Sequence, residues 1–369
     1  MTNKSKQIKH TSTMKTLLTI TTALLFTAGS AFAQSNDASI SQTANSSDAT
    51  VTQTGADNSA DLTQQFGQYH EATVEQVGDN NDLDLVQDNT NTFADIMQLG
   101  DDNVASIFQR SRLFVGPSGV GASIELTQNG NGNVADIRQD AEAGNGGSAT
   151  NMLSALQSGS DNYLFVDQNR DLGPGYNSAD IEQHGDDNTA SVTQDGESNS
   201  VLIEQGVYGG AESSIAEFTQ LGDGNYFETK QVRSVGNTVT GTQTGDDNFY
   251  RASLRGSDNT VTMDMEGDAN RGSWSIGSLG WPHQPAGNTL SIDVDGSDNY
   301  STGSIAGDYN TVSVVQEGLG NRLGTSWYTT DGVSISGDLN SASVMQTSDF
   351  NTASVSIAGN SNTATITQN

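Results

Sequence analysis

The sequence has no cysteine and few lysines and arginines, and these two features argue against disulfide bonds and against nucleic-acid binding. Without cysteine, disulfides cannot hold the chain together, although secreted proteins often use them. The 14 lysines and arginines face 45 aspartates and glutamates, which gives a formal net charge of −31. Binding to phosphates requires cationic patches, so nucleic acid is not an expected partner.

Long apolar runs are also scarce, and the longest lies near the N-terminus. Four lysines precede an apolar run from Thr16 to Gly29, and the small residues of Ala31-Phe32-Ala33 follow it. This order is typical of a bacterial secretory signal peptide, which we assign to residues 1–33. The run is shorter than the roughly 20 residues of a membrane helix, and no later run approaches that length. We therefore expect a secreted protein without membrane insertion.

Glutamine, by contrast, is abundant and regularly spaced. The low apolar content and the 41 glycines are typical of disorder, but disorder does not require a fixed spacing. Aligning the chain on glutamine gives 27 half-repeats, centred from Gln42 to Gln368, and 18 of the 26 intervals between them are eleven residues. Such a period indicates a small unit that is stacked on itself many times.

Each half-repeat combines an alternating segment with a turn. The consensus is Asn-x-Ala-x-Val/Ile-x-Gln-x-Gly-x-x, as in the segment from Asn103 to Gln109. Asn, Ala, Val/Ile and Gln share one parity, and polar residues occupy the other, which indicates a strand. Gly100-Asp101-Asp102 is typical of the turns, because glycine, aspartate and asparagine tolerate turn conformations. We therefore predict an all-β solenoid of stacked 22-residue strand-turn-strand repeats with two facing parallel sheets, about 60 Å long.

The glutamine position divides the mature chain into two sections. Residues 34–250 form a section in which glutamine fills every such position, and residues 251–369 continue the same solenoid with apolar substitutions. Leu254, Met265, Ile276 and Val294 fill the position first, which predicts a drier core there. From Ile305 onward isoleucine and glutamine alternate, so the two sheets should carry different columns.

Six longer intervals interrupt the period and predict loops at the turns. They follow Gln109, Gln139, Gln168, Gln205, Ile276 and Gln316. Four of them follow odd-numbered half-repeats, so we expect these four to project from one edge of the solenoid. They contain Trp281 and Trp327; together with Trp274, these aromatic residues are expected to cover the bases of the loops.

The repeat resembles the curlin repeat, Gln-x-Gly-x-x-Asn-x-Ala-x-x-x-Gln, as in the segment from Gln53 to Gln64. Curlins are secreted subunits of curli, the amyloid fibres of bacterial biofilms. The resemblance implies a solenoid that polymerises end to end, with roles in adhesion and the biofilm matrix. It also implies other curlin-type subunits and an outer-membrane export system as partners, and it implies neither enzymatic activity nor a cofactor.

The same resemblance makes the stacked amides the ladder and assembly residues. The candidates are Gln42, Gln53, Asn58, Gln64, Gln76, Gln87, Gln98, Asn103, Gln109, Asn133, Gln139, Gln183, Asn188, Gln194, Gln205, Gln316, Gln346 and Gln368. The first half-repeat begins at Asn36 and the last reaches Gln368, so both ends should present unpaired strand edges that can pair with another molecule.

The sequence offers three alternatives to fibre formation. A monomeric solenoid adhesin that binds polysaccharide or ice is the main alternative, although Asp61, Glu75 and Asp84 interrupt the outward threonines. Calcium could bind the aspartates of the turns, but the pattern lacks the spacing of the calcium nonapeptide. An enzyme is not expected, because His70, His184 and His283 have no metal-ligand spacing and no nucleophile motif appears.

Overall fold

The computed structural model describes residues 35–112, 121–142, 150–168, 176–207, 210–277, 284–324 and 332–369. The proposed signal peptide therefore lies outside the described residues. The described part of the chain is built from strands and turns. None of its segments forms a helix long and apolar enough to cross a membrane.

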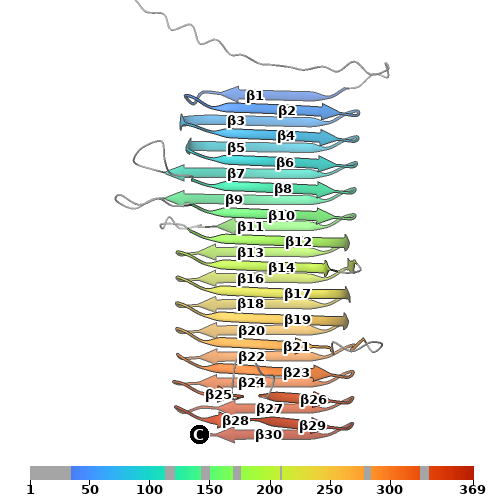
Figure 1. The fold of residues 1–369 in the computed structure, drawn as a ribbon, viewed down its shortest axis with the longest axis vertical. Helices are drawn as coiled ribbons and strands as arrows, with labels where there is room; N and C mark the ends of the chain where they lie inside the picture. Colours follow the sequence, from blue (N-terminus) through green and yellow to red (C-terminus); the bar gives the residue numbers. More distant parts are fainter. Residues whose placement is uncertain are drawn as a thin grey trace, which may run out of the picture.

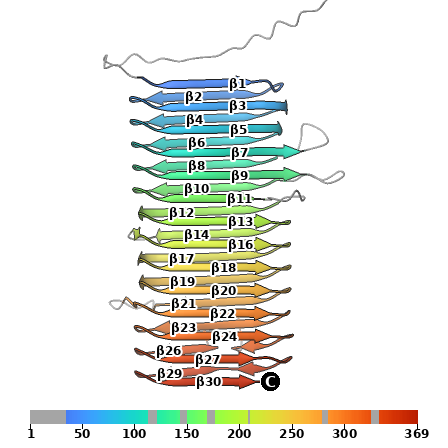
Figure 2. The same ribbon diagram turned by 180° about the vertical axis from the view of Figure 1, so that it is seen from behind.

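The strands form two parallel sheets that run the whole length of an elongated molecule (Figures 1 and 2). Sheet A contains β1 (Asp37–Gln42), β3 (Ser59–Gln68), β5 (Asp82–Thr90), β7 (Val104–Arg112), β9 (Val134–Glu142), β11 (Tyr163–Gln168), β13 (Thr189–Asp195), β16 (Ile215–Leu221), β18 (Thr238–Thr244), β20 (Thr260–Glu266), β22 (Thr289–Asp295), β24 (Thr311–Glu317), β27 (Ser341–Gln346) and β30 (Thr363–Gln368). Sheet B contains β2 (Asp48–Thr54), β4 (Glu71–Val77), β6 (Phe93–Leu99), β8 (Ser123–Asn129), β10 (Met152–Ser158), β12 (Ser178–Asp186), β14 (Ser200–Val207), β15 (Ala211–Glu212), β17 (Tyr226–Val235), β19 (Phe249–Ser257), β21 (Arg271–Ile276), β23 (Tyr300–Ala306), β25 (Arg322–Leu323), β26 (Val333–Ser336), β28 (Thr352–Ala353) and β29 (Val355–Ala358).

The chain alternates between the sheets, so one strand of each sheet makes one coil of the solenoid. Sheet A has 14 strands. Sheet B has 13 levels, because β25 and β26 share one level, β28 and β29 share another, and the short β15 lies beside β12 and β17. These 14 strands and 13 levels are the 27 half-repeats of the sequence. The predicted β-solenoid with two parallel sheets is confirmed.

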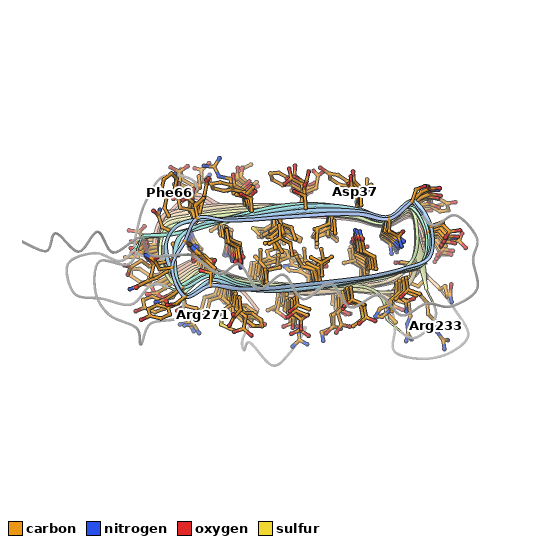
Figure 3. All side chains as sticks on the ribbon, turned by 90° about the horizontal axis from the view of Figure 1, so that it is seen from above. Asp37, Phe66, Arg233 and Arg271 are labelled. Atoms are coloured by element: carbon orange, nitrogen blue, oxygen red, sulfur yellow. The ribbon has the colours of Figure 1, made fainter. Side chains whose placement is uncertain are left out.

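Alternation within each strand places alanine and the branched apolar residues between the sheets (Figure 3). In one coil Ala60 and Leu62 of β3 face Ala72 and Val74 of β4, and all four are buried. Burying a leucine- or valine-sized side chain contributes about 1.5–3 kcal/mol. A single coil buries few such side chains, so the core is stable only because many coils stack.

Turns with glycine at positive φ hold successive coils close together. Gly55 has φ of 119° and Asp57 has φ of 56°. A Cβ atom on Gly55 would lie 1.8 Å from the carbonyl oxygen of Gly78, the equivalent residue of the next coil. Only glycine therefore fits this position, both for its backbone conformation and for the close approach of the next turn.

Three of the four insertions expected at one edge begin there, and the fourth does not. The insertions after Gln109, Gln139 and Gln168 follow β7, β9 and β11, where the chain passes from sheet A to sheet B (Figure 1). The insertion after Gln316 lies instead between β25 and β26, within one level of sheet B. Leu323 pairs with Ser301 and Val333 with Gly303, so the chain leaves this level of the sheet after Leu323 and returns to it at Val333, on either side of the position that Thr302 holds in the coil before. Turn spacing in the sequence could not distinguish these positions.

Aromatic side chains fill part of the core beside glycines. Phe218 and Phe227 stack with ring centroids 3.5 Å apart, and Phe227 stacks on Tyr250 at 5.3 Å. Trp274 is buried, and its indole Nε1 donates to Ser301 Oγ at 3.0 Å. The expectation that Trp274 covers a loop base is therefore wrong, because its position in β21 faces the core. Trp281 and Trp327 lie outside the described residues.

Glycine provides the room for these rings. A Cβ atom on Gly303 would lie 2.1 Å from the ring of Trp274, and one on Gly272 would lie 2.5 Å from the ring of Tyr250. Both glycines occupy strand positions that hold alanine or a branched residue in other coils. The core volume of this segment is therefore conserved by pairing a large residue in one coil with glycine in the next.

Candidate functional site

Buried glutamines form two ladders that run parallel to the axis of the solenoid. In sheet B the Nε2 atom of Gln53 donates to Oε1 of Gln76 at 2.8 Å, and Gln76 donates to Gln98 at 2.8 Å. The ladder continues with the same polarity through Gln128, Gln157, Gln183 and Gln205. In sheet A it runs through Gln42, Gln64, Gln87, Gln109, Gln139, Gln168, Gln194, Gln220 and Gln243. Every amide thus donates toward the C-terminal coils.

Each glutamine also connects the two sheets. The Nε2 atom of Gln64, on sheet A, donates to the carbonyl oxygen of Asp48 on sheet B at 2.9 Å. Gln76, on sheet B, donates in the same way to the carbonyl oxygen of Ser59 at 2.8 Å. Burial of an amide costs free energy unless its hydrogen bonds are made, and the ladder makes them along the axis and across the core.

Asparagines form further ladders beside the turns, with the opposite polarity. Oδ1 of Asn58 accepts from both the backbone N–H and Nδ2 of Asn81, at 3.0 and 2.9 Å. Nδ2 of Asn81 donates further to the carbonyl oxygen of Gly100 at 2.7 Å. Asn103, Asn133, Asn162 and Asn188 repeat this arrangement. Oδ1 atoms therefore point toward the C-terminal coils, whereas the glutamine Oε1 atoms point toward the N-terminal coils.

The structure brings the predicted site residues together in columns. Gln42, Gln64, Gln87, Gln109, Gln139, Gln194, Gln316, Gln346 and Gln368 lie on sheet A, Gln53, Gln76, Gln98, Gln183 and Gln205 lie on sheet B, and the four candidate asparagines share one edge. The same columns contain residues that were not among the candidates, although the period includes them: Gln128, Gln157, Gln168, Gln220, Gln243, Asn81 and Asn162.

The glutamine ladders stop in the second half of the chain. In sheet A, Gln243 pairs with Met265, Met265 with Val294, and Val294 with Gln316, after which Gln316, Gln346 and Gln368 resume the ladder. In sheet B, Gln231 pairs with Leu254, and Ile305, Ile335 and Ile357 form an apolar column. The predicted divergence of the two columns is confirmed. Oε1 of Gln316, which follows the apolar level of Val294, is buried without a hydrogen bond, and so is Oε1 of Gln231, which follows the level of Gln205.

The aspartates of the turns are already engaged by the backbone. Oδ1 of Asp79 accepts from the backbone N–H of Ala56 at 2.7 Å, and Oδ1 of Asp101 accepts from the N–H of Asp79 at 2.8 Å. These bonds connect the turns of successive coils. Within the described residues, no group of three or more His, Cys, Asp or Glu side chains is arranged to hold a metal ion.

Acidic residues also stack on the outer faces, where like charges repel. Asp61 pairs with Asp84, and Asp264 pairs with Asp293. Burial and the carboxylates of Asp61 and Asp82 raise the pKa of Asp84. Burial and Asp293 raise the pKa of Asp264, and burial with Glu182 and Glu204 raises that of Asp180. Some acids have cationic partners instead, such as Asp140, which accepts two hydrogen bonds from Arg110 at 2.6 and 2.9 Å.

The two histidines within the described residues, His70 and His184, each have a neighbouring partner. His70 is buried, with Nδ1 2.7 Å from Thr92 Oγ1 and Nε2 3.1 Å from the carbonyl oxygen of Phe66, and burial lowers its pKa. His184 lies partly exposed, 3.5 Å from Glu182. His283 lies outside the described residues. His70 thus closes a turn and occupies the level that asparagine holds elsewhere in its column.

The outermost strands have one neighbour each. Within the described residues β1 pairs with β3 alone, and β30 pairs with β27 alone. Side chains that are buried in central coils become partly exposed here, including Ile40, Val51, Ala364 and Ile366. Each end therefore presents a backbone edge and an apolar layer.

Comparison with known families agrees with this architecture. The curlin associated repeat matches three stretches spread along the solenoid, residues 55–88, 177–209 and 337–369. No curated protein matches the chain. The matched stretches contain the glutamine and asparagine columns described above, in both the amide-rich section and the section with apolar substitutions. The chain is a curlin-repeat protein.

Proposed function

We propose that this protein is a secreted structural subunit of curli-like fibres, which grow by stacking the solenoids end to end. One observation carries the proposal. Both outermost coils present unpaired strand edges whose side chains repeat the pattern of the coils inside the molecule. Unpaired edges are templates for another strand, and the curlin family supplies the precedent of self-assembly.

The direction of the ladders supports a polar stacking. At the N-terminal end the Oε1 atoms of Gln42 and Gln53 face outward as acceptors, since both residues donate inward to Gln64 and Gln76. At the C-terminal end Gln368 accepts from Gln346 and retains donor capacity on Nε2. Acceptors at one end and a donor at the other favour head-to-tail contact over contact between two like ends.

Fibres of this kind would contribute to adhesion and to the biofilm matrix at the bacterial surface. Other curlin-type subunits and an outer-membrane export system are the partners we propose. The polar ladders and like-charged outer columns are a structural arrangement, and we propose no enzymatic role.

A proline at the C-terminal edge provides the test. The N–H of Asp37 donates to the carbonyl oxygen of Asn58 in the following coil, and the N–H of Thr347 donates to that of Gln368, so outward-facing residues donate toward the C-terminal end. By this alternation the N–H of Thr365 faces the open edge. Thr365→Pro would remove that donor without removing a bond to β27, and proline is tolerated at an edge.

We expect the wild-type protein to form fibres on incubation, and Thr365→Pro to elongate far more slowly. Thr365→Ala, which retains the N–H, is the matched control and should elongate like the wild type. Electron microscopy and thioflavin fluorescence would follow both variants. A wild-type protein that stays monomeric would refute the proposal and favour the solenoid adhesin that binds a surface as a monomer.

A further inference from the structure

The two outermost strands of the described solenoid, β1 and β30, both belong to sheet A. Fourteen strands of sheet A and thirteen levels of sheet B leave the last coil with a strand on one side only. The described solenoid therefore has an odd number of half-repeats. This parity determines how a second copy fits on the end.

A copy added without rotation would leave a gap. Its β1 would lie on β30 and continue sheet A, whereas its β2 would lie two strand spacings beyond β28 and β29, or about 9.6 Å, in place of the usual ~4.8 Å. One level of sheet B would be absent, and the backbone groups on both sides of it would lack partners in a buried place.

We propose that successive subunits in the fibre are related by a half-turn about the fibre axis. This inference rests on the proposed end-to-end stacking. After a half-turn, β1 of the incoming copy lies on β28 and β29 and fills the absent level, and β2 lies on β30. Strand directions stay parallel, because the strands of the two sheets point in opposite directions and a half-turn about the axis reverses each strand as it exchanges the two sheets (Figures 1 and 2).

The side chains match in this arrangement. Gln53 of the incoming copy lies over Gln368, so Nε2 of Gln368 donates to Oε1 of Gln53 and the ladder continues. Ala49 and Val51 lie over Ala364 and Ile366, which are the residue types that stack inside the molecule. Asn36 lies over Asn351 and continues an asparagine column.

The two mismatched levels have precedents within the chain. Gln42 of the incoming copy lies over Ile357, as Gln316 lies over Val294. Ser47 lies over Asn362, as Ser214 lies over Asn188, where the N–H of Ser214 donates to Oδ1 of Asn188 at 3.2 Å. Each of the two mismatched levels therefore has a counterpart of the same kind inside the solenoid.

Cysteine cross-linking distinguishes the two arrangements, because the chain has no cysteine of its own. The half-turn places Thr52 of one copy beside Thr367 of the next, whereas stacking without rotation places Ser41 beside Thr367. All three side chains are exposed and face outward. Adjacent strands lie about 4.8 Å apart, within the reach of a disulfide. In the other arrangement the two residues of a pair lie on opposite sheets, about 10 Å apart, with side chains that face away from each other, which is beyond that reach.

Fibres of the double variant T52C/T367C should become covalently linked into long oligomers on mild oxidation. Fibres of the matched variant S41C/T367C should dissociate into monomers in denaturant without any reductant. The opposite result would overturn the half-turn while leaving the proposed fibre function intact. Absence of fibres from the wild-type protein would overturn both.

The helical symmetry of unmodified fibres gives a second, independent test. With a half-turn the axial rise per subunit is 13.5 coils, or about 65 Å. Without rotation the rise is 14 coils, or about 67 Å, with one weak level in each repeat. Electron cryomicroscopy should find a rotation near 180° and the shorter rise. A rotation near zero with the longer rise would contradict the inference.

Discussion

Two regions of the solenoid have the same backbone arrangement and differ in the side chain at the glutamine position of the repeat. Up to Gln243, glutamine occupies this position and connects successive coils and the two sheets by hydrogen bonds. From Leu254 to Ile305, apolar residues occupy it, and buried aromatic rings pair with glycines nearby. The strands stay in register across the change, as Gln243 pairs with Met265. The glutamine ladder is therefore one way to fill the core, and the backbone ladder defines the fold.

A change between glutamine and an apolar residue at this position costs free energy at a border between the regions. Sheet B changes from glutamine to apolar residues once, at Leu254, and sheet A changes twice, at Met265 and at Gln316. At the last of these borders Gln316 follows Val294 and leaves Oε1 buried without a donor. A buried unsatisfied polar group costs ~1–3 kcal/mol. A cost of this kind at a border favours long columns of one kind over mixed ones.

The largest effect is expected in the aromatic region. Gly303→Val should destabilise the protein by about 3 kcal/mol or more, because its Cβ atom would lie 2.1 Å from the ring of Trp274. The double variant Trp274→Val/Gly303→Val, which restores residues of ordinary size, should be more stable than either single variant. Chemical denaturation of the three variants measures this coupling. Additive effects would show that the ring and the glycine do not compensate each other.

The second-largest loss of stability is expected when a central glutamine of the amide region is removed. Gln128→Leu removes the donor to Gln157 and the acceptor of Gln98, and two backbone carbonyl oxygens lose a bond. We expect a loss of about 2–4 kcal/mol, from ~1–3 kcal/mol for each buried group left unsatisfied. The control Ile305→Leu, in the apolar column of the same sheet, should cost less than about 1.5 kcal/mol. Equal losses would mean that the ladder adds nothing beyond packing.

Acid should stabilise both regions, because both carry outward carboxylates with raised pKa values. Asp84 and Asp180 represent the amide region, and Asp264 the apolar region. A raised pKa means that the folded chain binds protons more tightly. The added stability is therefore fully present below the ordinary carboxyl pKa of about 3.9 and is lost as the pH rises through the raised values.

The midpoint of thermal unfolding should accordingly rise as the pH falls from 7 toward 4. Asp84→Asn and Asp264→Asn should each reduce this rise, and added salt should reduce it in the wild type. Thioflavin kinetics should accelerate over the same pH range and with salt or divalent cations. A constant midpoint and constant kinetics across this range would contradict the role of the acidic columns.

Calcium should have the smallest effect. Oδ1 atoms of the turn aspartates accept backbone N–H bonds, as Asp79 does from Ala56, so binding a cation would compete with those bonds. Calorimetric titration at millimolar calcium should show no saturable heat beyond general screening. Clear saturation would show that the stacked turns bind calcium, and a loss of that signal in Asp79→Asn would locate it.

The sequence predicted the repeat, the two parallel sheets and the separation of the two columns, because these depend on spacing and alternation alone. It did not predict that Trp274 lies in the core, since the signal is the compensating Gly303 one coil away and 29 residues later. Nor did it locate residues 324–332 within a strand level, because an insertion has the same length wherever the backbone leaves the sheet. The direction in which the side-chain amides donate along the axis could be seen only in the atomic positions, because the glutamine spacing is the same whichever way the amides point.

Diffraction from oriented fibres of the purified protein tests the central claim, that the solenoid continues from one molecule to the next along the fibre. We expect a sharp reflection near ~4.8 Å on the meridian, because coils stack along the fibre axis, and a spacing of ~10 Å on the equator from the two sheets. A ~4.8 Å reflection away from the meridian, or a protein that remains monomeric at every concentration tested, would contradict it.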